Sequence, residues 1–137
     1  MNSTKPKSTA VKIEKPWGFE IILTPENLDR AGKILFVKKG QRLSLQYHDQ
    51  KEETLCLFSG KALIWLENKN GGLDQVQMEP KKGYLISPME KHRVEAEEDC
   101  YIFEISSPEK GTTFRLEDDY GRRKETEESR KTRVSKW

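Results

Sequence analysis

Short apolar segments alternate with turn residues along most of the chain. Nine of these segments run for about four to seven residues and are rich in Ile, Leu, Val, Tyr, Phe or Trp, a composition that favours β-strands. They are residues 17–23, 33–37, 42–48, 54–58, 62–66, 73–78, 84–87, 92–96 and 101–106. No stretch between them keeps the i, i+3, i+4, i+7 spacing of an amphipathic helix for a dozen residues. The pattern predicts an all-β fold: a sandwich, jelly roll or barrel that is closed or nearly closed.

Both ends of the chain have little to bury. Residues 1–12 are rich in Lys, Ser and Thr, and residues 123–137 are dominated by charge. We therefore expect a flexible N-terminal segment over 1–12, one folded domain over 13–122, and a disordered or weakly helical tail over 123–137. Trp17 follows the first boundary, and we expect it to pack on the outside of the barrel.

Composition limits the class of protein. A chain of 137 residues with 34% hydrophobic residues can build one domain with a modest core. Charged residues make up 35%, and no apolar run approaches the ~18 residues of a membrane-spanning helix. The first ten residues lack the apolar stretch of a secretory signal, so we expect a cytoplasmic protein. We interpret Cys56 and Cys100, which form no Cys-x-x-Cys pair, as buried thiols rather than a disulfide or a zinc-thiolate site.

Charge is distributed unevenly along the chain. The 25 basic and 23 acidic residues nearly cancel, but residues 122–137 hold seven Lys or Arg and only three Glu. The rest of the chain is therefore mildly acidic. The three Glu interrupt the basic run and no aromatic residues alternate with it, so we expect a solvated tail and no nucleic-acid partner.

The most informative segment is 42–48, in which polar and apolar residues alternate. Every second residue from Arg42 to His48 is polar, while Leu43, Leu45 and Tyr47 lie between them. In a strand these sets face opposite sides. A surface strand with its leucines in the core explains this pattern as well as a functional site does.

Two further residues favour a site. Glu53 shares its predicted strand face with two leucines, and His92 opens a strand with Val94 and Ala96 on its own side. If these side chains converge with Gln46 and His48, two imidazoles, a carboxylate and an amide oxygen would suit a divalent zinc, manganese, iron or nickel ion. Such a set leaves coordination positions open, which indicates catalysis or ligand capture rather than a structural metal.

Four separated motifs resemble the cupins, and in particular the cupin domain of type II phosphomannose isomerases. They are Glu-Lys-Pro-Trp-Gly-Phe-Glu at 14–20, Arg-Leu-Ser-Leu-Gln-Tyr-His at 42–48, His-Arg-Val at 92–94 and Arg-Leu-Glu-Asp-Asp-Tyr-Gly-Arg at 115–122. In that family the domain occurs alone or fused behind a mannose-1-phosphate guanylyltransferase. The resemblance covers about residues 13–122 and occurs in the family's order.

The resemblance implies a single-domain cupin jelly roll that interconverts mannose 6-phosphate and fructose 6-phosphate. It also implies a divalent metal held by Gln46, His48, Glu53 and His92. Zinc is our first expectation, with manganese, iron, nickel and cobalt open. A phosphorylated sugar is the expected partner, together with a second copy of the chain in a homodimer. No nucleic acid and no membrane are expected.

The implied reaction requires a proton shuttle and a phosphate clamp. Arg42 shares its predicted face with Gln46 and is our first candidate for binding phosphate or stabilising charge. Lys51 is the second and Arg93, which alternation points away from His92, is a weaker one. Glu104 is our candidate for moving the proton.

Two alternatives remain open. One is a non-catalytic sugar- or nucleotide-sugar-binding cupin associated with a guanylyltransferase. The other is a different metal-dependent cupin enzyme, an epimerase or a dioxygenase. The glutamine in the ligand set argues against the dioxygenase, because such enzymes use two histidines and one carboxylate.

Overall fold

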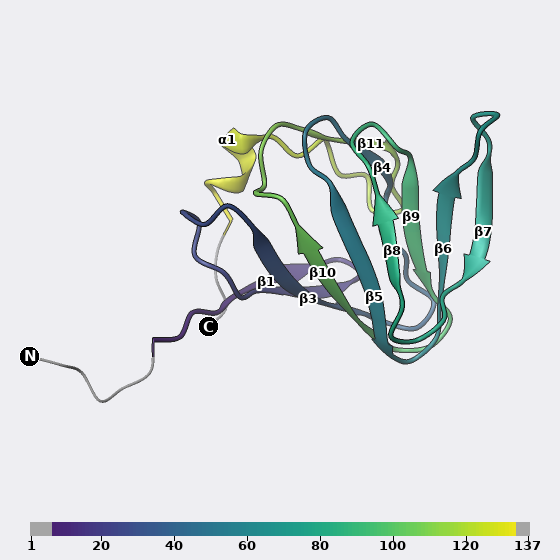
Figure 1. Cartoon of the computed structure of the whole chain (residues 1–137), viewed down its shortest axis with the longest axis horizontal. Helices are drawn as coiled ribbons and strands as arrows, with labels where there is room; N and C mark the ends of the chain where they lie inside the picture. Colours follow the sequence, from purple (N-terminus) through teal and green to yellow (C-terminus); the bar gives the residue numbers. More distant parts are fainter. Residues whose placement is uncertain (1–6, 134–137) are drawn as a thin grey trace, which may run out of the picture.

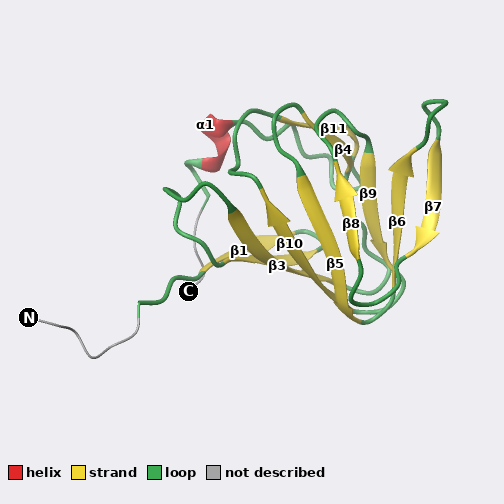
Figure 2. Ribbon diagram, viewed as in Figure 1, coloured by secondary structure: helices red, strands yellow, loops and turns green. Residues whose placement is uncertain are grey.

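Two antiparallel sheets make up the computed structural model, which describes residues 7–133 (Figures 1 and 2). The six-stranded sheet runs in the order β1 (Val11–Lys15), β2 (Gly18–Ile22), β3 (Ala31–Val37), β10 (Cys100–Ser106), β5 (Glu53–Ser59), β8 (Gly83–Ile86). The five-stranded sheet runs β11 (Thr113–Glu117), β4 (Leu45–His48), β9 (His92–Ala96), β6 (Ala62–Glu67), β7 (Leu73–Gln77). The predicted all-β jelly roll is confirmed.

All nine predicted strands are present, and the described residues contain two more. The first, β1, begins at Val11, inside the segment expected to be flexible, and the second is β11. Their sequences, Val-Lys-Ile-Glu-Lys and Thr-Phe-Arg-Leu-Glu, are too charged to stand out as apolar segments. Residues 1–6 lie outside the described part of the chain.

Inward-facing positions change from apolar to polar along several strands. The sequences of buried positions are Cys100, Ile102, Glu104, Ser106 on β10; Val37, Leu35, Lys33 on β3; Leu57, Leu55, Glu53 on β5; and Ala96, Val94, His92 on β9. The pairing register places Glu104 beside Lys33 and Cys100 beside Val37, so the polar residues collect at one end of the sandwich. Trp17 is 4% exposed and belongs to the hydrophobic core, so our expectation that it packs outside was wrong.

The segment after Tyr120 folds back over the polar end, where α1 lies in the upper left of Figure 1. Within it, α1 (Glu127–Arg130) is a single turn whose N-cap, Thr126, exchanges hydrogen bonds with Ser129. This turn has no buried residue, and ion pairs attach the segment to the rest of the chain. The described part of the predicted tail is thus ordered around a weak helix, and residues 134–137 lie outside the description. No helix between residues 7 and 133 is long and apolar enough to cross a membrane.

Candidate metal centre

Three residues from three strands meet at the polar end of the sandwich. His48 ends β4, Glu53 begins β5 after a four-residue loop, and His92 begins β9, which pairs with β4 opposite Gln46. Glu53 Oε1 lies 3.0 Å from His92 Nε2 and 3.3 Å from His48 Nε2. All three side chains are buried, and one donor atom from each lies within 4.8 Å of the others.

The tautomer of His92 shows what this arrangement lacks. His92 Nδ1 lies 3.0 Å from the carbonyl oxygen of Glu90, which can only accept, so Nδ1 carries the hydrogen. The lone pair of Nε2 then faces a carboxylate oxygen of Glu53. Nε2 is buried and has no hydrogen-bond donor. Two acceptors at 3.0 Å need a proton or a cation between them.

The surrounding residues fit a divalent cation. Ligands about 2.1 Å from a metal and at right angles lie about 3.0 Å apart, close to the separations observed here. His48 Nδ1 forms a 2.7 Å hydrogen bond with Thr113 Oγ1, which orients the ring as second-shell partners do in metal sites. Burial lowers the pKa of His48 and so keeps its imidazole neutral, the form that binds metals. Burial opposes ionisation of Glu53, but the Lys51 ammonium and the two imidazoles hold its pKa well below the usual range.

Gln46 enters the same cavity as His48, as predicted from the alternation. Its Oε1 accepts a 2.7 Å hydrogen bond from Ser44 Oγ. A carboxamide oxygen has a second lone pair, so this bond leaves one free for a metal. Coordination by Gln46 stays a prediction.

Lys51 and Glu104 lie beside the three central residues. Lys51 Nζ is 2.8 Å from Glu104 Oε2 and 3.3 Å from Glu53 Oε2, so one ammonium bridges two buried carboxylates. Burial alone would lower the pKa of Lys51, but these carboxylates raise it, so the amine stays charged. Burial raises the pKa of Glu104 to about 7, although Lys51 opposes the shift.

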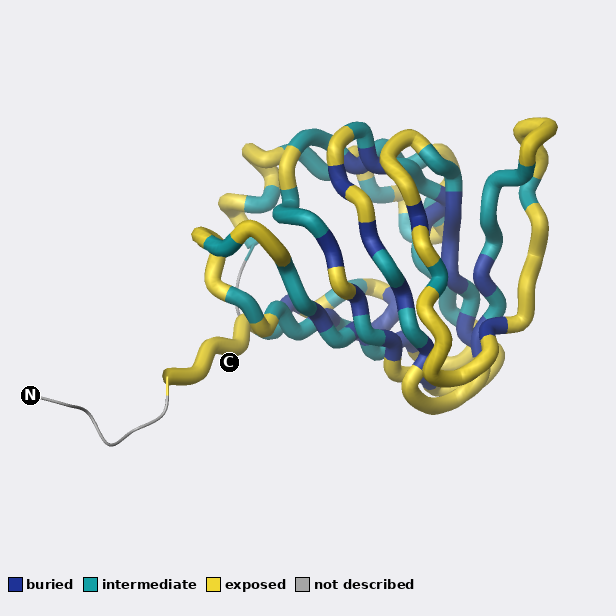
Figure 3. Tube along the Cα trace, viewed as in Figure 1, coloured by how far each residue is buried: buried dark blue, intermediate teal, exposed yellow. Residues whose placement is uncertain are grey.

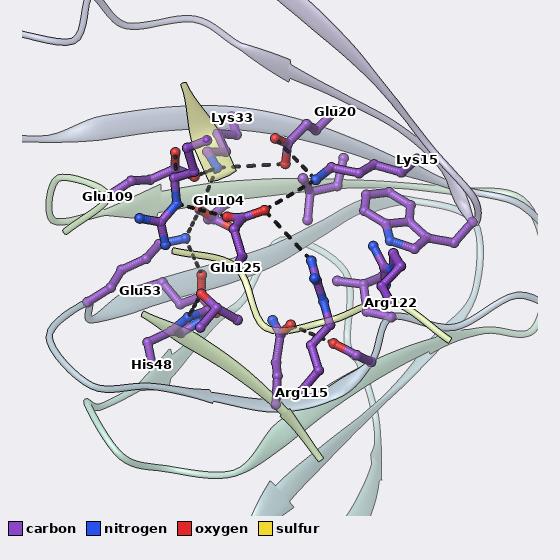
Figure 4. A pocket seen from close by; sticks show the side chains of 18 residues that line it. Lys15, Glu20, Lys33, His48, Glu53, Glu104, Glu109, Arg115, Arg122 and Glu125 are labelled. Carbon is purple, nitrogen blue, oxygen red and sulfur yellow. Dashed lines mark hydrogen bonds and ion pairs between the residues drawn. The ribbon is translucent and has the colours of Figure 1, made fainter. Parts of the chain in front are cut away.

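Further charged residues complete the cavity, and most of them escaped the sequence analysis. Figure 4 shows side chains from both sheets and from the C-terminal segment pointing into one space. Lys33 is buried and pairs with Glu20, Glu104 and Glu109. A usable signal was present, because Lys33 shares its strand face with core residues Leu35 and Val37.

Arg42 and Arg93 do not line the cavity. Arg42 forms a two-pronged ion pair with Asp119, with 2.6 Å between Nε and Oδ2, on the far side of the five-stranded sheet. Arg93 is buried there as well: its Nε donates to the carbonyl of Leu43, and both guanidinium groups lie within 6 Å of the Trp65 ring. Neither arginine is placed to bind a ligand inside the barrel.

The mouth of the barrel divides into an inner and an outer space. The inner cavity holds about 60 Å³, room for a few water molecules. Outside it lies a groove of about 550 Å³ between β1 and the C-terminal segment. Lys15, Arg115, Arg122 and Glu125 line both spaces. Six of the twelve residues lining the groove are Lys or Arg and two are Glu, so it favours anions.

The chain resembles known proteins in its structure but not in its sequence. The sequence matches no family model and no curated protein. Among solved structures, an oxalate decarboxylase variant from Bacillus subtilis superposes with a TM-score of 0.69 over 85% of this chain and 34% of that one, at 15% identity. The chain has the cupin fold. The capsular polysaccharide assembling protein CapF from Staphylococcus aureus superposes with a TM-score of 0.65 over 92% of this chain and 34% of that one, also at 15% identity.

A further oxalate decarboxylase structure concerns the Mn(II) centres of that enzyme. It superposes on this chain with a TM-score of 0.66 at 20% identity, over 77% of this chain and 30% of that one. This chain spans about a third of the length of the solved structures that it matches. These likenesses establish the fold. The evidence for a metal site is instead the group formed by His48, Glu53 and His92, whose donor atoms could hold an ion.

Proposed function

We propose that this cupin is a metal-dependent isomerase of phosphorylated sugars that interconverts mannose 6-phosphate and fructose 6-phosphate. The observation that carries the proposal is the convergence of His48, Glu53 and His92, with the lone pair of His92 Nε2 directed at a carboxylate. The motif resemblance to type II phosphomannose isomerases supplies the substrate. CapF, by its name a capsular polysaccharide assembling protein, supports a place in polysaccharide precursor metabolism.

His48, Glu53 and His92 would hold the divalent ion, with Gln46 as a fourth ligand. When bound, such an ion polarises a carbonyl and stabilises negative charge on neighbouring substrate oxygens. The donor set does not single out zinc, our first expectation. The Mn(II) named for oxalate decarboxylase makes manganese an equal candidate.

Glu104 is the residue suited to move the proton between adjacent sugar carbons. A pKa of about 7 lets its carboxyl group both accept and release a proton near neutral pH. Lys51 remains protonated and therefore does not act as a base. Its ammonium instead positions the carboxylates of Glu104 and Glu53 on either side of one nitrogen.

The outer groove replaces Arg42 and Arg93 as the proposed phosphate site. Arg123 and Lys124 are exposed at its rim, and Arg115 and Arg122 connect it to the inner cavity. Guanidinium groups bind phosphate oxygens in pairs, so a phosphate here would leave the sugar directed toward Glu104 and the metal ligands.

The substrate needs more room than the inner cavity provides. Small-molecule sites usually offer about 300–1,000 Å³. The segment carrying Arg130 and Arg133 closes the mouth through ion pairs with Glu109, Glu125 and Glu20. Because this segment buries no helix residue and is held by charge, we propose that it moves aside when the sugar enters.

The same closed mouth favours the second candidate, a sugar-binding cupin without turnover. In that case the groove alone would hold an anionic sugar derivative, and the inner metal would be inaccessible to it. This candidate predicts ligand binding at the groove with no formation of fructose 6-phosphate.

The two candidates separate in one experiment. The purified chain is loaded with Mn²⁺ or Zn²⁺, its metal content is measured, and a coupled assay follows fructose 6-phosphate formed from mannose 6-phosphate. We expect bound metal and turnover, and a loss of metal affinity in His92→Ala greater than the roughly 10–100-fold typical of second-shell changes. Lys91→Ala, next in sequence, is the matched control and keeps both.

Each contrary result has a clear meaning. Metal without turnover would reject the isomerase and support the binding module. A wild-type chain that takes up neither metal after reconstitution would reject the metal centre itself.

A further inference from the structure

Glu125 lies where the outer groove meets the inner cavity, and cations from three parts of the chain surround it. Its Oε2 lies 3.8 Å from Lys15 Nζ, at the end of β1, and 3.7 Å from Arg115 Nη2 on β11. Its Oε1 lies 2.8 Å from Arg130 Nε on α1. In Figure 4 the dashed lines from Lys15 and Arg115 meet at this carboxylate. A side chain of the C-terminal segment thus occupies a site that cations form.

Lys15 and Arg115 are poorly satisfied by this carboxylate. Both distances exceed the ~3.2 Å limit of an N–H···O hydrogen bond. The other carboxylate beside Lys15, that of Glu20, is 3.9 Å away. Arg115 Nε is buried and has no hydrogen-bond partner among the described residues. The two side chains are only 12% and 11% exposed, so little water reaches them in compensation.

The electrostatics of the junction agree with the distances. Burial lowers the pKa of Lys15, and its two carboxylate neighbours do not offset the shift. Lys33 and Lys51 are also buried, yet their carboxylate partners raise the pKa of each. Burial and two neighbouring guanidinium groups likewise lower the pKa of Arg115. The junction therefore carries more positive charge than the Glu125 carboxylate neutralises.

The Glu125 side chain can leave this site without unfolding the chain. Backbone hydrogen bonds of 2.8 and 2.9 Å join Thr113 and Glu125 in both directions, so the main chain is held independently of the carboxylate. No residue from 121 to 133 is buried, as the yellow and teal tube at the upper left of Figure 3 shows. Arg130 also keeps a 3.0 Å hydrogen bond to the carbonyl oxygen of Gly111. Displacement of the carboxylate therefore breaks ion pairs but exposes no apolar core.

We propose that Lys15 and Arg115 form a phosphate site, and that the Glu125 carboxylate is an internal stand-in that phosphate displaces. A phosphate group carries a charge of about −1.5 to −2 at neutral pH and offers three acceptor oxygens. It can therefore reach both cations at hydrogen-bond distance, which one carboxylate oxygen does not do here. The inference deepens the proposed function and rests on it for the sugar that carries the phosphate.

The test is the affinity of the full chain for inorganic phosphate, measured by isothermal titration calorimetry at low ionic strength. Metal is removed first, so that phosphate cannot bind to it. Loss of an internal competitor raises the apparent affinity of a ligand, so Glu125→Gln should bind phosphate about 5-fold or more tightly than the wild type. Lys15→Met and, separately, Arg115→Met should weaken binding about 10-fold, because each removes a charge-assisted hydrogen bond.

Two control variants remove the same charges close by. Glu14 lines the same groove but is 52% exposed, so water screens its charge. Glu14→Gln should therefore change the phosphate affinity less than about 2-fold. Lys131 lies just after α1 and is 74% exposed, and Lys131→Met should have an equally small effect. Circular dichroism equal to that of the wild type establishes that each variant is folded, and Lys15→Met tests the site without altering the C-terminal segment.

The direction of the Glu125→Gln effect decides the question. If Glu125 only holds Lys15 and Arg115 in place, its substitution weakens phosphate binding or leaves it unchanged, and the proposal is wrong. Equal tightening in Glu14→Gln would indicate a general effect of charge and would also overturn it. Two further results would do the same: binding that survives both cation substitutions, or no binding to wild type and Glu125→Gln at about 10 mM phosphate, where a millimolar site is filled.

These outcomes are distinct from failure of the proposed reaction. A chain that binds phosphate in competition with Glu125 but forms no fructose 6-phosphate would contradict the isomerase and support the site. A chain that turns over mannose 6-phosphate while Glu125→Gln fails to tighten phosphate binding would support the isomerase and contradict the site.

Discussion

The two halves of the barrel interior are equally buried but chemically opposite. On β10, Ile102 is 0% and Glu104 6% exposed, two positions apart on one face. On β3, Leu35 is 2% and Lys33 4% exposed. Burial of the apolar half removes hydrocarbon from water and stabilises the fold. Burial of the charged half costs desolvation energy that its ion pairs recover only in part.

The comparison indicates a division of labour along single strands. Apolar inward residues hold the two sheets together at one end, and the same strands carry ionisable groups into the other end. A structure selected for stability alone would extend the apolar half, because replacing buried ion pairs with packed apolar residues is often neutral or stabilising. The proposed function gives the charged half its reason, because the candidate metal ligands and Glu104 lie there.

The strongest test of this division uses two residues of β10. Ile102→Ala should lower the free energy of unfolding by about 3–4 kcal/mol, through lost transfer energy and the cavity left behind. Ser106→Ala should change it by less than about 0.5 kcal/mol or raise it, because the buried Ser106 Oγ has no hydrogen-bond partner among the described residues. Urea denaturation of both variants measures the difference. Equal losses would show that both halves stabilise the fold alike.

A second test uses the pH dependence of stability, measured with chelator present so that no metal competes. Glu104 has a folded pKa of about 7 against an ordinary value of 4.5. Between these values the folded chain keeps a proton that the unfolded chain has released. Stability contributed by this group therefore falls as pH rises from about 4.5 to 7, by about 2–3 kcal/mol at most.

Glu104→Gln isolates this contribution, because glutamine resembles the protonated acid at every pH. The wild type and the variant should be equally stable near pH 4.5 and diverge toward pH 7, with the variant the more stable. Glu125 has the opposite effect on the pH dependence of stability, and at lower pH. Lys15 and Arg130 lower its pKa to about 2, so the stability that its carboxylate contributes is lost as pH falls below about 4.5. Parallel pH profiles for the wild type and Glu104→Gln would contradict the buried, shifted carboxyl group.

Alternation along strands predicted the all-β fold, and it singled out the central trio of the site only together with the family resemblance. Glu53 and His92 stood at positions that shared a face with core residues, and His48 stood on the polar face of its strand with Gln46. The structure brings the three together. Lys33 obeyed the same rule, but an isolated lysine in a strand is usually exposed, and its partner Glu109 lies in a distant loop. Contacts between Arg133 and Glu20 join segments 113 residues apart, which local patterns do not encode.

Arg42 shows where alternation fails. The predicted strand 42–48 shortens to Leu45–His48, and Leu43 and Ser44 lie in irregular backbone before it. Both of these residues line the cavity, so the period of two is broken between them and Arg42 emerges on the other side of the sheet. Sequence alone does not reveal such a break, because no Gly or Pro marks it.

The position of Arg42 leads to the smallest predicted effect. Its ion pair with Asp119 joins side chains that are 32% and 40% exposed, so water screens the attraction. Arg42→Ala should therefore lower the free energy of unfolding by about 0.2–1 kcal/mol. Most of this difference from the wild type should disappear in 1 M salt, which screens the ion pair. Metal affinity and the KM for mannose 6-phosphate should stay at wild-type values. A large rise in KM would indicate that Arg42 binds the substrate after all. A loss of several kcal/mol in the free energy of unfolding would show that charges outside the barrel stabilise the fold as much as its apolar half does.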